Sequence, residues 1–109
     1  MSGIPGVNEK DWKLLRSRLP GWQEAYMDKL NHEYMAILGG EGRPSEKFWK
    51  LHDRIRQDIY SSGVKVVMKR SNMKIILMNL LEEGVITADD LEGFSDELRE
   101  LLLAFAKTR

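Results

Sequence analysis

The stretch that decides the fold is MKIILMNLL, residues 73–81. Its apolar residues recur at helical spacing on one face, and Ile75 and Met78 add apolar surface on other sides. This pattern is typical of a helix that is surrounded by other helices. We therefore predict a central core helix, whose main buried face consists of Met73, Ile76, Leu77, Leu80 and Leu81.

The segment directly before this helix, residues 64–70, has a mixed pattern. Its β-branched residues Val64, Val66 and Val67 favour a strand. A strand needs a partner, and the sequence contains no second strand-like segment to pair with it. We therefore favour a helix, either running on from about 64 to 83 or starting afresh with Ser71 as its cap, and the extended alternative stays open.

Three further helices are predicted on the N-terminal side. Asn8 and Asp11 form a variant of the capping box at the start of a helix over residues 9–19. Pro20 lacks an amide donor and is expected to separate this helix from a second one over 20–38, which Gly39 ends. Ser45 is placed to cap a third helix that ends near residues 60–63.

Two short amphipathic segments follow the core helix. Thr87 and Asp90 fit a capping box for a helix over about 88–93, and Ser95 can cap the last helix. The predicted fold is all-α, a compact five- or six-helix bundle of orthogonal or mixed packing. It forms a single domain over residues 9–109, preceded by a flexible N-terminal arm over 1–8.

Composition excludes several classes of protein. The chain has 109 residues, with 17 basic and 17 acidic side chains, so no strong global field attracts nucleic acid or anionic membrane. It has no cysteine, which excludes disulfides, thiolate nucleophiles and zinc–cysteine sites, and fits a reducing compartment. The longest mostly apolar run, residues 75–81, is far shorter than the ~20 residues of a membrane span. We expect a soluble, cytoplasmic protein without membrane insertion.

The charge pattern marks one candidate interaction surface. Between Asp58 and Glu82 every charged residue is basic, whereas residues 82–100 carry eight acids and one base. On a helix the basic residues approach one face and form a strip that can bind phosphate or an acidic partner. The alternative is an ordinary solvated face, partly neutralised by the acidic C-terminal region. The strip consists of Lys65, Lys69, Arg70 and Lys74.

Aromatic residues mark a second candidate. Phe48 and Trp49 are adjacent and cannot point the same way on a helix, so one of them is expected to be partly exposed. Trp49 is the better candidate for an anchor in contact with a partner. Packing against the first helices is the alternative interpretation.

Signals of catalysis and of metal binding are weak. The residues three positions before His32 and His52 are Lys29 and Trp49, so the glutamate-x-x-histidine pattern of di-iron bundles is absent. The glycine-rich segment 39–43 lacks the spacing of a phosphate-binding loop and follows a predicted helix. We predict no catalytic residue, no metal ligand and no cofactor, and hence no enzyme.

The chain contains five distinctive sequence blocks: residues 11–14 (DWKL), 22–27 (WQEAYM), 70–73 (RSNM), 84–86 (GVI) and 90–98 (DLEGFSDEL). These blocks resemble a family of small, uncharacterised, all-helical bacterial proteins, some labelled multidrug transporters. The resemblance covers most of the chain and implies a bacterial, cytosolic setting, with no known activity, cofactor or catalytic residue. No spanning segment or nucleotide-binding motif supports transport.

The function that the sequence favours is that of a non-enzymatic helical module for protein–protein interaction or regulation. It would bind another protein through Lys65, Lys69, Arg70 and Lys74, with Trp49 as a further contact. The alternative is a small nucleic-acid-associated regulator that uses the same strip. A small enzyme, built around a pocket that joins a histidine to acids, is a third possibility. The sequence leaves the partner and the oligomeric state open.

Overall fold

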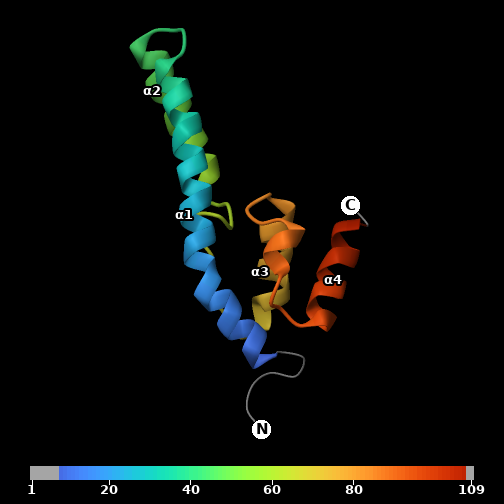
Figure 1. Ribbon diagram of the computed structural model, residues 1–109. Coiled ribbons are helices and arrows are strands. Elements are labelled where there is room, and N and C mark those ends of the chain that lie inside the picture. The colour runs from blue at the N-terminus through green and yellow to red at the C-terminus, as the bar shows by residue number, and fades with distance from the viewer. Residues whose placement is uncertain (1–7, 108–109) are drawn as a thin grey trace.

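The computed structural model describes residues 8–107, and the proposed N-terminal arm falls almost entirely outside them. The described chain is all-helical and contains no strand (Figure 1). Two 3₁₀ turns, η1 (Arg70–Asn72) and η2 (Ala88–Leu91), separate the later helices. The α-helices are α1 (Glu9–Gly39), α2 (Pro44–Asp58), α3 (Met73–Glu82) and α4 (Asp96–Lys107).

The expectation of five or six helices is wrong for two reasons: the helices predicted over 9–19 and 20–38 are one, and the short helix predicted over about 88–93 is the 3₁₀ turn η2. α1 runs without interruption through Pro20 for 31 residues. A proline inside a helix removes one hydrogen bond and bends the axis. Figure 1 shows α1 bending in its lower part. The helix continues because apolar residues on both sides of the proline are held in contacts: Leu19 is buried before it and Leu30 after it.

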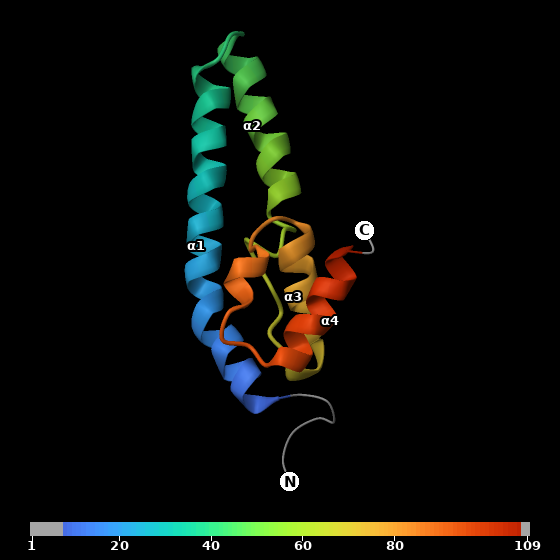
Figure 2. The same cartoon turned by 45° about the vertical axis from the view of Figure 1, so that its right-hand side comes forward.

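The expected helix over residues 64–70 is also absent. Residues 65–69 form an extended connection between α2 and α3, which is visible in Figure 2. Gly63 enters this connection against the ring of Tyr26, where a Cβ atom would come within 2.2 Å of the ring. In an extended chain alternate side chains face the same way, so Val66 and Met68 both pack against the core. This packing stabilises the extended form of the segment, although no second strand within the described residues pairs with its backbone.

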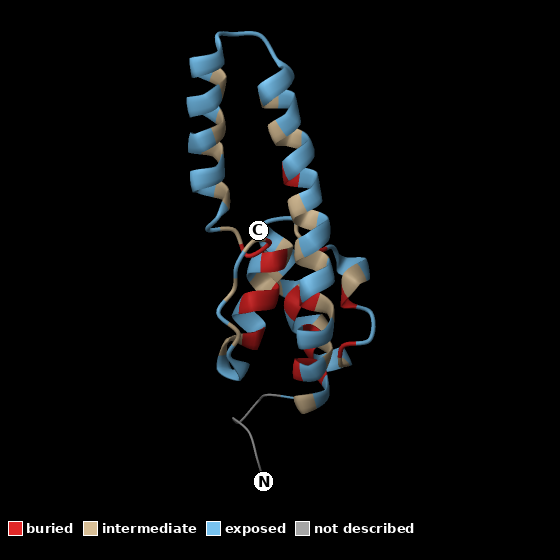
Figure 3. Cartoon of the chain, turned by 90° about the vertical axis from the view of Figure 1, so that its left-hand side faces the viewer, coloured by how far each residue is buried: buried red, intermediate tan, exposed pale blue. Residues whose placement is uncertain are grey.

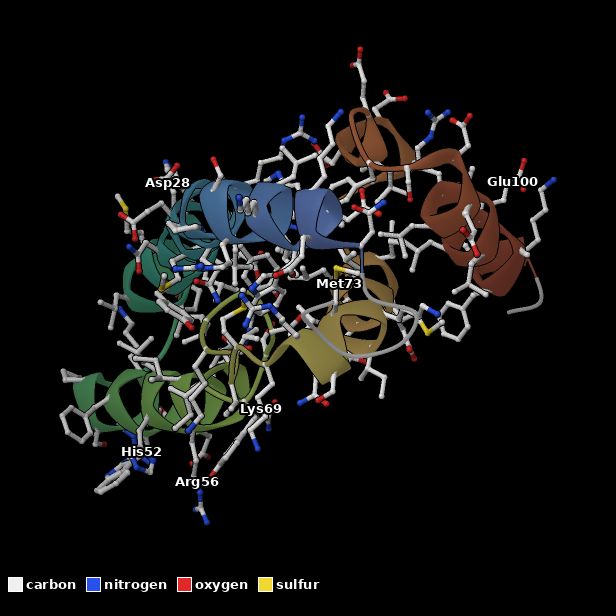
Figure 4. The ribbon with its side chains drawn as sticks, turned by 90° about the horizontal axis from the view of Figure 1, so that it is seen from below. Asp28, His52, Arg56, Lys69, Met73 and Glu100 are labelled. Carbon is white, nitrogen blue, oxygen red and sulfur yellow. The ribbon has the colours of Figure 1, made fainter. Side chains whose placement is uncertain are left out.

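The core lies where the N-terminal half of α1 meets α3 and α4 (Figure 3). The predicted face of the central helix is confirmed for Met73, Ile76, Leu77 and Leu80, and Leu81 is half-buried. Figure 4 shows Met73 pointing toward the space between α1 and α4. The other buried members of the cluster are Trp12, Leu15, Leu19, Ile86, Leu91, Phe94, Leu98 and Leu102.

Capping residues fix several helix ends. Thr87 and Asp90 form the predicted capping box, with the Thr87 N–H donating to Asp90 Oδ2 at 2.8 Å. Ser95 accepts from the Leu98 N–H at 3.3 Å, as expected for the cap of α4. Ser45 does not cap α2, because this helix already begins at Pro44.

A helical hairpin projects from the core and makes the molecule elongated. The C-terminal half of α1 and the whole of α2 form this hairpin (Figure 2). The extents are 60 × 27 × 20 Å and the radius of gyration is 17.0 Å. A compact domain of this length has a radius of gyration of about 13 Å. The expectation of a compact bundle is therefore wrong for the hairpin, although the core itself is packed.

Candidate functional site

The structure separates the predicted basic residues instead of aligning them on a helix. Lys65 and Lys69 are exposed and lie at alternate positions of the extended connection, whereas Arg70 lies in η1 and Lys74 in α3. Figure 4 shows Lys69 pointing away from α1. The prediction that these four residues lie along one face of a helix is therefore wrong. The four residues remain close in sequence.

Two of these basic side chains interact within the chain. Arg70 Nε lies 3.0 Å from Glu9 Oε2, and its guanidinium lies 5.7 Å from the centre of the Trp12 ring. Lys65 Nζ lies 5.2 Å from the centre of the Tyr60 ring. Lys69 and Lys74 form no ion pair with any residue that the structure describes.

Trp49 lies on α2, far along the chain from the basic residues, and it is 58% exposed. Its neighbour Phe48 is 62% exposed, so both aromatic side chains reach solvent. The sequence predicted that at least one of the two would be partly exposed. The two rings meet edge to face at a centroid distance of 5.0 Å, and the rings of Trp49 and His52 meet edge to face at 5.4 Å. Figure 4 shows His52 pointing away from α1.

A polar cluster sets the register of the hairpin. The Tyr34 hydroxyl donates to Asp58 Oδ2 at 2.6 Å, and Arg54 Nε lies 3.0 Å from the same oxygen. Arg54 also pairs with Glu33. Burial, followed by the hydrogen bond to Asp58, raises the pKa of Tyr34 to about 12. The hydrogen bond from Arg54 to Glu33 raises the pKa of the guanidinium above its ordinary value.

The hairpin exposes large apolar side chains beside its internal contact line. On α2 the better covered residues recur at Lys47, Leu51, Arg54 and Asp58, which places them along one line toward α1. The exposed apolar residues lie roughly a quarter turn further around the helix, since successive residues are about 100° apart. These residues are Phe48, Ile55 and Ile59, with exposures of 62%, 39% and 38%.

α1 has the same arrangement. Tyr26, Leu30 and Ile37 mark its contact line, and Met27, Tyr34 and Leu38 lie up to a quarter turn beyond it. Because the helices are antiparallel, both displacements lead to the same side of the hairpin. We refer to this side as the apolar flank, and define it as Met27, Tyr34, Leu38, Phe48, Ile55 and Ile59.

The opposite side of the hairpin is polar and exposed. It carries Ala25, Lys29, His32 and Ala36 from α1, together with Glu46, Lys50, Asp53 and Gln57 from α2. The hairpin is therefore amphipathic as a unit. The recurrence of apolar residues at positions 48, 55 and 59 is a visible signal of this flank in the sequence, but no interface was predicted there.

The groups considered for catalysis and metal binding lie on the surface. His32 Nδ1 lies 2.8 Å from the backbone oxygen of Asp28, and His52 Nδ1 lies 3.3 Å from Asp53 Oδ1. Both histidines are exposed and interact within their own helices. Within residues 8–107, no three histidine, aspartate or glutamate side chains come together as a metal site would require.

Comparisons with protein-family models, curated proteins and solved structures found no match. None of the described helices combines the length and the apolar character that crossing a bilayer requires.

Proposed function

We propose that this chain is a protein-interaction module that acts by binding alone, and that it assembles with a second copy of itself through the apolar flank. The observation that carries the proposal is the placement of exposed Phe48, Ile55 and Ile59 on the same side as Leu38. Scattered apolar residues need no explanation, whereas a continuous apolar side on a projecting element is typical of an interface.

The geometry favours a second hairpin as the occupant. In a four-helix bundle each helix contacts two neighbours, in directions about a quarter turn apart. α1 and α2 each carry one covered line and one apolar line with such a displacement. Two copies related by a twofold axis would complete the bundle. The six residues that define the flank carry no charge, so no like charges among them would meet.

The area of the apolar flank sets the expected strength of dimerisation. α2 has 15 residues, which corresponds to a length of about 22 Å. Two helices side by side are about 20 Å wide, so two copies would bury roughly 900 Å² in total, typical of a transient interface. We therefore expect dimerisation that depends on concentration.

The test compares two charge-matched double variants by sedimentation velocity, from about 10 µM to about 1 mM protein. Phe48→Glu with Ile55→Glu places two carboxylates on the apolar flank, and should weaken dimerisation at least tenfold. Ala36→Glu with Gln57→Glu adds two carboxylates to the polar side, and should leave it unchanged. Circular dichroism checks that both variants keep their helix content.

Three outcomes would overturn assembly with a second copy. The first is a wild-type chain that stays monomeric over the whole concentration range. The second is equal weakening of dimerisation by both double variants, because the apolar flank would then have no special part. The third is a monomer whose flank binds a helical hairpin of a different protein, which would replace the second copy as occupant.

A further inference from the structure

The extended connection between α2 and α3 presents two different faces. Val64, Val66 and Met68 are half-buried, whereas the residues between them, Lys65 and Val67, are exposed. Lys69, which ends the segment, is exposed and has strand-like dihedral angles, φ −135° and ψ 137°. This alternation is the pattern of a β-strand with one face on the core and the other in solvent.

The backbone of this segment is unpaired at its centre. The N–H groups of Val64 and Lys65 donate to Ser61 O, and Lys69 O accepts from the Asn72 N–H. Between these points, the N–H and C=O groups of residues 66–68 form no hydrogen bond with any other residue within the range 8–107. Unpaired strand-like backbone is a template for another extended chain.

A groove lies along the segment on the side of α3. Its volume is about 260 Å³, and its lining includes Tyr60, Val67 and Ile75. These three side chains are among the most exposed apolar residues described, at 75%, 72% and 59%. Asn79 and Glu83 of the α3 region add polar atoms to the wall. The groove therefore offers apolar contacts to side chains of a strand paired with the segment.

The charge of the segment selects the occupant. Lys65 and Lys69 lie on its exposed face, and no acid occurs from residue 59 to residue 81. The groove lining includes the acid Glu83, whose carboxylate already accepts from the N–H and the hydroxyl of Ser62. Antiparallel pairing of two copies about Val67 would place Lys65 opposite Lys69, and like charges directly opposite are destabilising. An acidic strand would instead place carboxylates beside these lysines.

We propose that an extended acidic segment of another polypeptide pairs with residues 65–69 as an added β-strand, with apolar side chains in the groove and carboxylates beside Lys65 and Lys69. This adds a second surface to the proposed interaction module. It depends on the unpaired backbone and on the charge, and not on the apolar flank of the hairpin.

The test uses fluorescence anisotropy with three labelled peptides. Glu-Val-Glu-Val-Glu-Val-Glu has the proposed chemistry, and Lys-Val-Lys-Val-Lys-Val-Lys reverses its charge. Glu-Pro-Glu-Pro-Glu-Pro-Glu keeps the acidic residues and removes alternate backbone donors. We expect the first peptide to bind at least about tenfold more tightly than the other two. Amide exchange measured by NMR should slow by at least about tenfold within residues 66–68 when it binds.

Two charge-matched protein variants locate the surface. Lys65→Glu with Lys69→Glu should weaken binding of the Glu-Val peptide at least about tenfold. Lys29→Glu with Lys50→Glu makes the same change of charge on the polar side of the hairpin, and should leave binding unchanged. The Phe48→Glu, Ile55→Glu variant should also bind the peptide normally, so failure of dimerisation and failure of this proposal are distinguishable.

Three results would overturn the proposal. The first is equal binding of the Glu-Pro peptide, since attraction would then need no strand pairing. The second is unchanged exchange within residues 66–68 in the bound state. The third is tighter binding of a thymidine oligonucleotide that Lys65→Glu with Lys69→Glu abolishes, which would assign the surface to nucleic acid.

Discussion

At the scale of single residues, Asp11 connects the start of α1 to the start of α4. It is 2% exposed, and its carboxylate accepts from the Ser95 N–H at 2.8 Å and from the Ser95 hydroxyl at 2.6 Å. Asp11→Ala leaves this N–H without its acceptor, so the free energy of unfolding should fall by about 1–3 kcal/mol in urea denaturation. Glu24→Ala, at an exposed position of the same helix, should change it by less than about 0.5 kcal/mol. Equal losses would contradict the assigned role of Asp11.

The same residue shows how far local patterns reach. Asn8 accepts from the N–H groups of Lys10 and Asp11, as expected for a helix cap. The Asp11 side chain, however, bonds to Ser95, 84 positions away, instead of completing a local capping box. Arg18 likewise donates to the backbone oxygen of Asp90 at 3.1 Å. Spacing predicts contacts within one turn of helix, but it contains no information about which distant backbone group a side chain meets.

At the scale of elements, Tyr34 makes the hairpin less stable at alkaline pH. Its pKa rises from 10.0 to about 12 in the folded chain, because of burial and the hydrogen bond to Asp58. The stabilising contribution is fully present below pH 10, where tyrosine is protonated in both states. From pH 10 to about 12 the unfolded chain loses the proton first, so the contribution falls with rising pH and is lost above that range.

Tyr34→Phe should lower the free energy of unfolding by about 1 kcal/mol at neutral pH. The difference from wild type should shrink as the pH rises from 10 to about 12. Urea denaturation of both proteins across this range measures the difference. Tyr60→Phe is the matched control, since Tyr60 is 75% exposed. A Tyr34→Phe difference that stays constant with pH would exclude the linkage.

Sequence patterns predicted α2, α3 and α4 near their observed positions and failed at two connections. Pro20 was expected to divide a helix, but the packing of Leu15, Leu19 and Leu30 on either side keeps α1 continuous. Residues 64–70 were favoured as a helix because a strand partner was missing. In the structure, contacts of Val66 and Met68 with the core stabilise the extended form. Both failures are cases in which tertiary packing overrides local preference.

At the scale of the whole molecule, burial is uneven. The residues of the core cluster come from the N-terminal half of α1 and from residues 73–102, whereas α2 has no buried residue among its 15. An amphipathic stripe in a sequence does not specify whether the same chain or another chain covers it. This is why the sequence predicted a compact bundle, while the structure has a packed core and a projecting hairpin.

Uneven burial predicts uneven stability, which native-state hydrogen exchange measures residue by residue. Regions with few buried contacts open without global unfolding, so amides of α2 should exchange at least about 100-fold faster than those of Leu77 and Leu80 in dilute protein. If the apolar flank joins two copies, α2 protection should rise with protein concentration. In the Phe48→Glu, Ile55→Glu variant it should stay low at every concentration. Equal protection of α2 and α3 in dilute wild type would contradict this division, because the hairpin would then unfold only together with the core.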